Sequence, residues 1–377
     1  MTPPSLLLAA RNYPPNSGGT AHLLYELFKH FPEESLVAVT GASYVTEAVG
    51  EPLPFRRHEA LVLKSHFVTA RFARRLPSSY RALARRTIRE VARATGAERI
   101  LAHYPDGNFL VAAYQAAEDL GLPLAVYFDI LWEERGDNTE LAREFERRVV
   151  HRADARFAIT PFAAEHLQQK HGVAFEVVPH VMSVTPDPPA EEIGPPEGPV
   201  VHFAGGVYDR MNKDAVERLA AVVMSERNAE LEIFGPELEA SLSANILGDP
   251  AVRTGFAKRS EMNRIQRAAS VLYLPQAFDS AYPQMIRCNF PTKALEYMRA
   301  GRPILVHSPA DSYLSSVARD YGFAQVVGRP DPEALRGSLN RLLEDRHLRL
   351  ELVRAGRRFL ADHDSAVWAP RFRSRLQ

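Results

Sequence analysis

The segment from Asn289 to Pro303 holds the residues with the clearest chemical potential. Its pattern predicts a short helix, with Thr292 as the N-cap and Gly301 as the residue that ends it. Lys293 would lie beside the positive end of this helix, which is a favourable place for a diphosphate. Glu296 lies one residue past the capping-box position, so its carboxylate could accept hydrogen bonds from a vicinal diol such as a ribose. A surface helix with an ordinary glutamate is the alternative.

Two glycine pairs follow apolar runs elsewhere in the chain. Gly18 and Gly19 open a predicted helix, where backbone N–H groups attract anions and the lack of side chains permits close approach. Gly206 follows the apolar run at 200–204, and Arg210 and Lys213 come soon after it. These two cations could hold a phosphate. Neither glycine pair forms a G-x-G-x-x-G motif, which weakens a nicotinamide-dinucleotide interpretation. The alternative for Gly18 and Gly19 is a loop that merely needs positive φ, and the alternative for the segment from Gly206 to Lys213 is a solvated loop.

The elements that would position these residues alternate between apolar strands and amphipathic helices. An apolar run at 5–10 leads through a Pro/Gly-rich loop into a helix that reaches about His30, and a second run follows at 35–40. Strand, helix and strand in this order indicate a parallel sheet with crossover helices. Further strands are predicted at 99–103, 124–128, 156–160, 175–178, 200–204, 231–234, 252–255, 271–274, 304–306 and 324–327, with helices between them. The fold class is therefore α/β, with two Rossmann-like doubly wound domains.

A proline-rich stretch separates the two series of strands. Residues 185–199 carry many prolines, which continue neither a helix nor a ladder, so they predict a linker. The expected domains are 1–185 for the acceptor, a linker at 186–199, and 200–360 for the donor. A helical segment at 361–377 would pack back on the first domain. Parallel sheets bind ligands at the carboxyl ends of their strands, and these ends are expected to face one another across a cleft.

Composition excludes several classes of protein. The chain has 377 residues, with 46 Lys and Arg against 46 Asp and Glu, so overall charge does not favour binding to nucleic acid. A single cysteine, Cys288, excludes an intrachain disulfide and a Cys-based metal site. No apolar run has the length of a membrane span, and the first run lacks the basic leader of a signal peptide. A cytoplasmic protein is expected.

At these motifs the chain resembles a known family. Pro14-Pro15 with Gly18-Gly19, the segment Pro291–Pro303, and the stretch 254–275 are similar to the retaining nucleotide-sugar glycosyltransferases of family 4. The resemblance implies a GT-B fold and a nucleotide-diphosphate sugar as donor, with no cofactor.

The resemblance also implies roles for individual residues. Gly18 and Gly19 would contact the diphosphate region from the first domain, and Gly206, Arg210 and Lys213 from the second. Gly255 belongs to the segment that matches the base pocket, Thr292 and Lys293 lie at the helix start, and Glu296 would hold the ribose. The E-x7-E pattern of the family would place its first glutamate at 288, where this chain has Cys288, so the choice of donor sugar is open.

Two residues at strand ends are candidates for catalysis on the acceptor side. His103 and Asp129 each follow a predicted strand, where the family has residues that line the acceptor cleft. Both could instead be satisfied loop residues, and Asp106 is expected to form a turn before Gly107. In the family the acceptor hydroxyl is thought to attack on the face that the diphosphate leaves, and the diphosphate takes the proton. The only Asp-x-Asp string, Asp362–Asp364, is interpreted as a solvated helix end, so no metal is expected.

Residues 56–99 carry twelve Lys and Arg against three Glu, an excess of nine. Apolar residues between them suggest basic amphipathic helices, which favour anionic lipid headgroups and would suit a lipid-linked acceptor. A peripheral position on the inner face of the membrane is therefore one expectation. Solvated helix faces or a pocket for a phosphorylated acceptor explain the same pattern.

The function expected from the sequence is transfer of a sugar from a nucleotide-diphosphate sugar to a hydroxyl acceptor, a glycan or a lipid-linked molecule, with retention of configuration and without a metal. A nucleotide-sugar epimerase on the same fold is one alternative. A catalytically silent nucleotide-binding partner of another glycosyltransferase is the other, because Cys288 replaces the glutamate.

Overall fold

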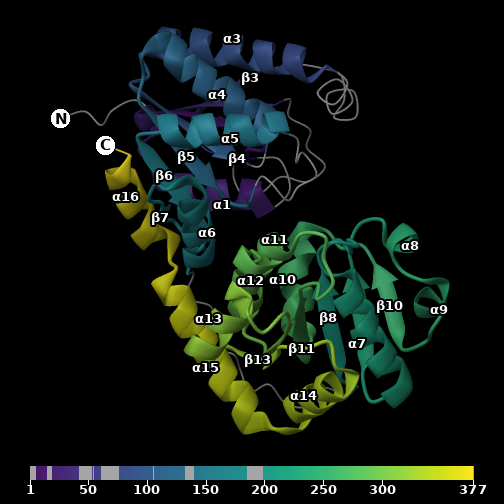
Figure 1. Ribbon diagram of the computed structural model, residues 1–377. Helices are drawn as coiled ribbons and strands as arrows, with labels where there is room; N and C mark the ends of the chain where they lie inside the picture. Colours follow the sequence, from purple (N-terminus) through teal and green to yellow (C-terminus); the bar gives the residue numbers. More distant parts are fainter. Residues whose placement is uncertain are drawn as a thin grey trace. The chain divides into compact units, whose positions relative to one another are not determined.

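The computed structural model describes residues 6–14, 19–41, 53, 55–60, 76–104, 106–131, 140–184 and 198–376 (Figure 1). The chain forms two compact units. Unit 1 consists of Met1–Ser183 with Ser365–Gln377, and unit 2 of Val184–Asp364. Each unit is built on one parallel sheet, with helices connecting the strands (Figure 1). Most of the predicted linker at 186–199 lies outside the described residues.

Unit 1 contains a seven-stranded sheet in the order β3-β2-β1-β4-β5-β6-β7. Its strands are β1 (Leu6–Ala10), β2 (Leu36–Thr40), β3 (Arg56–Glu59), β4 (Arg99–Tyr104), β5 (Leu124–Phe128), β6 (Ala155–Ala158) and β7 (Glu176–Val177). Its helices are α1 (Gly19–Phe28), the 3₁₀ turn η1 (Glu33–Ser35), α3 (Pro77–Thr95), α4 (Gly107–Leu120), α5 (Glu140–Arg152), α6 (Pro161–His171) and α16 (Ser365–Arg375). Every residue of β1, β2 and β5 is buried, which explains their continuous apolar sequence.

Unit 2 contains a six-stranded sheet in the order β10-β9-β8-β11-β12-β13. Its strands are β8 (Val200–Ala204), β9 (Glu230–Phe234), β10 (Val252–Gly255), β11 (Val271–Pro275), β12 (Ile304–His307) and β13 (Ala324–Val327). Its helices are α7 (Lys213–Glu226), α8 (Leu238–Ser241), α9 (Ala244–Leu247), α10 (Arg259–Ala268), α11 (Pro283–Cys288), α12 (Lys293–Ala300), α13 (Tyr313–Tyr321), α14 (Pro332–Glu344) and α15 (Arg346–Asp362).

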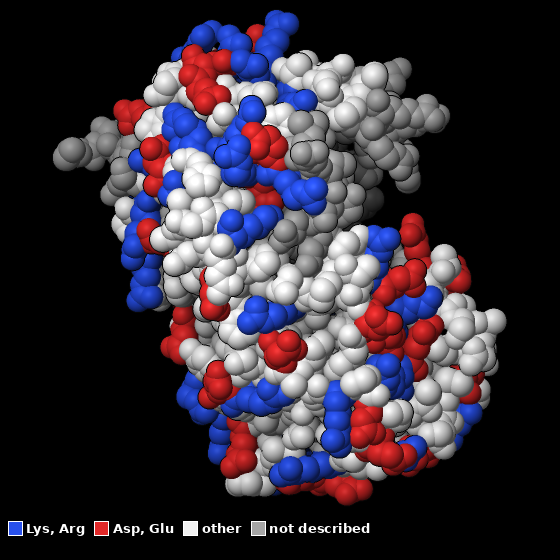
Figure 2. Space-filling view, viewed as in Figure 1, with Lys and Arg blue, Asp and Glu red and all other residues white. Residues whose placement is uncertain are grey.

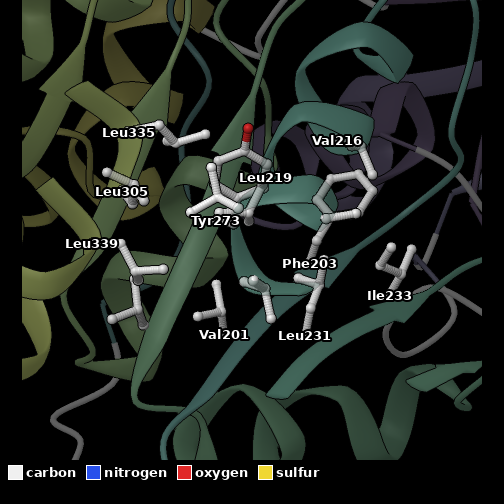
Figure 3. Packing of buried hydrophobic residues seen from close by; sticks show 14 of the residues in the cluster. Val201, Phe203, Val216, Leu219, Leu231, Ile233, Tyr273, Leu305, Leu335 and Leu339 are labelled. Carbon is white, nitrogen blue, oxygen red and sulfur yellow. The ribbon is translucent and has the colours of Figure 1, made fainter. Parts of the chain in front are cut away.

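One face of the sheet in unit 2 carries a dense apolar core. Alternate residues of the strands, such as Val201 and Phe203 on β8, belong to one apolar cluster with Leu219 of α7 and Leu335 of α14 (Figure 3). Side chains alternate across a strand, so the residues between them point to the opposite face. The core thus fixes the strands, and the loops at their carboxyl ends are held at defined positions.

The carboxyl-terminal helix α16 belongs to unit 1. Phe372 packs against the rings of Phe28, Tyr127 and Phe157. Ser365 at its start contributes further contacts, since its N–H donates to the carbonyl of Met182. The last helix is therefore part of the hydrophobic core of unit 1.

The strand order reverses once in each sheet. In unit 1 the chain passes from β1 outward to β2 and β3, then returns to β4 on the other side of β1; in unit 2 the same change occurs between β8 and β11. Ligands of open parallel sheets bind at such a switch point, beside the carboxyl ends of the central strands. The residues that follow β1, β4, β8 and β11 are therefore the first to consider for function.

The structure corrects the interpretation of residues 56–99 as basic amphipathic helices at one end and confirms it at the other. Residues 56–59 form the edge strand β3, whereas Pro77–Thr95 form the basic amphipathic helix α3; residues 61–75 lie outside the described residues. Three residues of β3 are exposed, and an edge strand can carry charges because its outer side faces solvent. The strand was missed because its sequence, Arg-Arg-His-Glu, has no apolar alternation.

Candidate functional site

Three glycines lie at the carboxyl ends of three neighbouring strands in unit 2. The N–H of Gly205, after β8, donates to the carbonyl of Phe234 (2.7 Å), and the N–H of Gly235, after β9, donates to the carbonyl of Gly255 on β10 (2.8 Å). A Cβ atom on Gly235 would lie 2.1 Å from the carbonyl oxygen of Gly205, so a side chain cannot be added there without movement. Gly205 has φ of 132°, a conformation that favours glycine. The edge of the sheet is thus bare backbone at the switch point.

Lys293 extends its side chain over this bare edge. An ideal Cβ on Gly205 would lie 2.6 Å from the Lys293 Nζ, so the ammonium occupies the space that the glycine leaves. Burial lowers the pKa of Lys293, and the nearby Glu296 carboxylate opposes this shift. Within the described ranges, no carboxylate forms an ion pair with Lys293. An ammonium that is partly buried and lacks such a partner is suited to bind an anion, which would compensate its lost hydration.

Glu296 lies one turn further along α12 and faces the start of α10. Its Oε1 atom is 3.5 Å from the Arg259 guanidinium, and its side chain is 19% exposed. The carboxylate can still accept hydrogen bonds from a diol, because Arg259 contacts one of its two oxygens. Sequence reasoning missed Gly235, for which a glycine directly after an apolar strand was the available signal. Arg259 lies in the stretch 254–275 that the resemblance singled out, although it was given no role of its own.

The predicted N-cap role of Thr292 is wrong. Thr292 has helical dihedral angles (φ −54°, ψ −29°), and its side chain makes no capping hydrogen bond. A capping side chain reaches the first turn from an extended backbone, and this residue is already part of the helical path. The predicted end of the helix is confirmed, since Gly301 has φ of 70° and its N–H donates to the carbonyl of Met298.

The two cations after β8 have partners on neighbouring loops. The Arg210 guanidinium donates to the Tyr282 hydroxyl and lies 4.9 Å from the centre of its ring. Lys213 Nζ is 3.1 Å from Asp209 Oδ1. Of the predicted donor residues, the structure brings Gly206, Lys293 and Glu296 near the bare edge at Gly205, whereas Arg210 and Lys213 are engaged elsewhere.

Gly255 ends β10, two strands from Gly205, and lies against Phe234. A Cβ atom there would lie 3.4 Å from the Phe234 ring. Cys288, at the end of α11, is buried, with 2% exposure. Its thiol is therefore withdrawn from the surface at the position where the family pattern has a glutamate.

In unit 1 the structure brings His103, Asp129 and Thr20 together. The Thr20 hydroxyl donates to Asp129 Oδ2 (2.8 Å), and His103 Nε2 lies 3.7 Å from the same oxygen, too far for a hydrogen bond. Thr20 follows Gly19 at the start of α1, while Gly18 lies outside the described residues. A carboxylate that follows β5 is thus oriented by a hydroxyl at the start of the helix that follows β1. Thr20 was missed, although its place after a glycine pair was a signal.

His103 is held in a neutral state. Burial, together with the nearby His180, lowers its pKa to about 3. The residue is 1% exposed and its ring packs edge-on against Tyr127. A neutral imidazole cannot form an ion pair with Asp129 at neutral pH. Asp129 is the group at this place that the Thr20 hydroxyl contacts.

Asp106 has a structural role that differs from the predicted turn. Its carboxylate caps α4 by accepting the Phe109 N–H (2.9 Å) and also accepts from the Arg11 guanidinium (2.8 Å). Both contacts stabilise the helix start, where a negative charge is favoured.

The basic helix α3 does not present its apolar face to solvent. Tyr80, Ala84, Ile88 and Val91 are buried, and α3 packs against α4. Arg85 forms a two-atom contact with Asp119 of α4. On the face shown in Figure 2, basic and acidic side chains are interspersed over both units. The amphipathic pattern of α3 is therefore explained by packing inside unit 1. The apolar face of this helix is not available to insert into a membrane.

Within the described part of the chain, no helix combines the length and apolar character needed to span a bilayer. The same residues contain no group of three or more His, Cys, Asp or Glu side chains that could hold a metal ion.

Two parallel α/β units, each with candidate functional groups at the carboxyl ends of its strands, fit the GT-B class of fold. Two family models match this chain: Glycosyltransferase Family 4 over residues 17–184, and Glycosyl transferases group 1 over residues 198–345. These ranges cover most of the sequence, so the chain belongs to the family 4, group 1 glycosyltransferases. No protein of curated function matches the sequence.

Solved structures share the fold at low identity. WaaG, a glycosyltransferase involved in lipopolysaccharide biosynthesis, has a TM-score of 0.65 and 16% identity over 99% of both chains. Alr3699/HepE of Anabaena, in complex with UDP and glucose, has a TM-score of 0.71 and 12% identity over 98% of both chains. A UDP-forming α,α-trehalose-phosphate synthase from Burkholderia xenovorans, in complex with glucose-6-phosphate, has a TM-score of 0.67 and 15% identity, over 99% of this chain and all of that one (100%). The likeness establishes the GT-B fold.

Proposed function

We propose that this protein transfers a sugar from a nucleoside-diphosphate sugar to a hydroxyl acceptor, with retention and without a metal. The observation that carries the proposal is the Lys293 ammonium over the bare backbone at Gly205. A diphosphate that binds there would meet a fixed cation beside the carboxyl end of β8, at the switch point. The similar Alr3699/HepE structure contains UDP and glucose, which supports a UDP-sugar as the first donor to test.

In the reaction, the bond between the sugar C1 and the diphosphate oxygen breaks and a bond from C1 to the acceptor oxygen forms. The diphosphate leaves with its electron pair and takes the proton of the acceptor hydroxyl. Lys293 would stabilise the charge that develops on the leaving group, since a positioned cation in a partly dehydrated site acts most strongly where charge appears. Glu296 would hold the ribose, and Asp129, oriented by Thr20, would hold the acceptor hydroxyl.

A set of calorimetric titrations with UDP, GDP and ADP, each with EDTA and with Mg²⁺, tests donor binding and metal dependence together. We expect one nucleoside diphosphate to bind equally well under both conditions. Failure of all three to bind would remove the proposal, and binding only with Mg²⁺ would remove its metal-free part. Retention is tested separately by assigning the anomeric configuration of the product by NMR.

The buried Cys288 favours a second candidate, a catalytically silent nucleotide-binding partner, because no glutamate is available there to contact the sugar. The two candidates differ in turnover. A transferase releases nucleoside diphosphate when acceptors are added, and a silent partner binds nucleotide without releasing product. Epimerisation on the same fold would change the donor sugar without any acceptor, which NMR of the donor pool would detect.

Contact with an anionic membrane and a lipid-linked acceptor stay proposals. Support comes from the excess of cations at 56–99 alone, since the apolar face of α3 is buried. Co-sedimentation with vesicles of phosphatidylcholine and 30 mol% (about one lipid in three) phosphatidylserine tests it, because surface attraction to anionic lipid is worth about 1 kcal/mol per cation. Parent protein that stays in the supernatant at low salt would refute membrane contact.

A further inference from the structure

The loop after β8 places an exposed aromatic ring on the backbone of Gly206. An ideal Cβ on Gly206 would lie 2.4 Å from both Cζ and the hydroxyl oxygen of Tyr208, so the ring occupies the space that the glycine leaves open. Tyr208 nevertheless keeps 58% of its surface exposed. A side chain at position 206 would displace the ring, and the glycine is therefore what allows the ring to lie there.

The loop holds Tyr208 in place through its backbone. The Tyr208 N–H donates to Asn212 Oδ1 (2.9 Å), and Asn212 Nδ2 donates to the Gly206 carbonyl (3.1 Å). The Tyr208 carbonyl accepts from the N–H groups of Met211, Asn212 and Lys213 (3.0, 3.2 and 3.2 Å). An exposed ring on such a fixed backbone needs little reorganisation to bind a ligand, which lowers the entropic cost of binding.

The contacts form a sequence that matches the order of groups in a nucleotide sugar. Glu296 lies one turn from Lys293, Lys293 covers Gly205, and Tyr208 covers the next residue, Gly206. In the donor, the ribose is followed by the diphosphate and then by the sugar ring. The aromatic ring thus lies on the residue next to the one that is covered by the cation assigned to the diphosphate.

We propose that Tyr208 determines donor specificity by stacking against the sugar ring of a nucleoside-diphosphate sugar. The face of an aromatic ring is electron-rich and attracts the positively polarised C–H edge of a pyranose. With Cys288 buried, Tyr208 supplies a contact to the sugar from the loop after β8, by apolar stacking in place of a carboxylate. This inference rests on the proposed function, and it assigns the sugar-recognition part of that site.

The test compares Tyr208→Ala and Tyr208→Phe in binding UDP and UDP-glucose, measured by calorimetry, with GDP/GDP-mannose and ADP/ADP-glucose as further pairs. We expect Tyr208→Ala to weaken the nucleotide sugar about tenfold, the scale of one stacked ring. The sugar-free diphosphate should bind the variant as it binds the parent. Tyr208→Phe retains the ring and should behave as the parent, and since the residue is exposed, both variants should keep the parent melting temperature.

Each other outcome overturns the inference in a different way. An equal loss for UDP and UDP-glucose would show a general contact to the nucleotide, and tighter binding of UDP by Tyr208→Ala would show that the ring merely covers the phosphate site. A loss in Tyr208→Phe would assign the effect to the hydroxyl. If UDP binds the parent but Tyr208→Ala binds every nucleotide sugar as tightly as the parent does, only the role of Tyr208 is refuted. If no nucleotide binds the parent, the proposed function is refuted as well.

Discussion

Replacing Lys293 by methionine should weaken diphosphate binding and stabilise the free protein at the same time. Methionine has nearly the shape of lysine without its charge, so packing over Gly205 is largely kept. A hydrogen bond from an ammonium to a phosphate contributes about 1.5–3 kcal/mol. The affinity for the preferred nucleoside diphosphate should therefore fall by about 10- to 150-fold.

The gain in stability follows from the direction of the pKa shift. Burial lowers the pKa of Lys293, so the folded protein holds this proton less firmly than the unfolded chain does. At a pH below the pKa that Lys293 has in the folded protein, the side chain is charged in both states, and the folded state is destabilised by the burial of the ammonium. As the pH rises from this pKa to that of the unfolded chain, the folded state loses the proton and its stability increases. Removal of the charge should raise the free energy of unfolding by about 1 kcal/mol, which is the usual gain when a binding-site residue that destabilises the folded state is replaced. For a domain of this size this corresponds to a rise of about 2–4 °C in melting temperature.

Calorimetric titration gives the affinity, and thermal unfolding at pH 7 without ligand gives the stability. Arg357→Met is the control, because Arg357 is an exposed cation of the same unit on α15, outside the proposed site, and should change neither quantity strongly. Unchanged affinity in Lys293→Met would refute the assignment of the diphosphate site. A lower melting temperature of the free variant would refute the argument that the ammonium is buried at a cost.

Three further predictions follow from the described contacts. Glu296→Ala should weaken nucleotide binding by about 1–3 kcal/mol, the scale of charged hydrogen bonds, and calorimetry with a ribose and a 2′-deoxyribose nucleotide should show the loss only for the former. Thr20→Val removes the hydroxyl that orients the acceptor-side carboxylate, and we expect kcat to fall while nucleotide affinity is kept; equal kcat in steady-state assays would contradict this role. Burial lowers the pKa of His103 to about 3 and those of His202 and His307 to about 4. Between about pH 4 and 6.5 the unfolded chain then binds more protons, so stability should fall with falling pH, by up to roughly 1.4 kcal/mol per pH unit for each histidine; a urea midpoint that is constant between pH 7 and 5 would contradict it.

The sequence predicted the elements that are buried on both faces. Strands such as β1 and β5 are continuous apolar runs, and a proline or glycine marks many helix boundaries, as Gly301 does at the end of α12. These signals are local, because burial on both faces and the backbone preferences of glycine and proline act on the residues themselves. The edge strand β3 was missed, since its pairing with β2 gives it structure and its side chains carry no apolar pattern.

The sequence alone determined which residue types were available at the strand ends, among them Lys293, Glu296, Asp129 and the glycines after the strands. Tertiary structure decided which of them meet: Lys293 lies over Gly205, 88 positions earlier in the chain, and Thr20 reaches Asp129 across 109 positions. It also showed that the apolar face of α3 is buried inside unit 1. The physical reason is that parallel strands gather their carboxyl ends at one edge of a sheet whatever their separation in sequence, and the order of the strands is set by packing that no local pattern encodes.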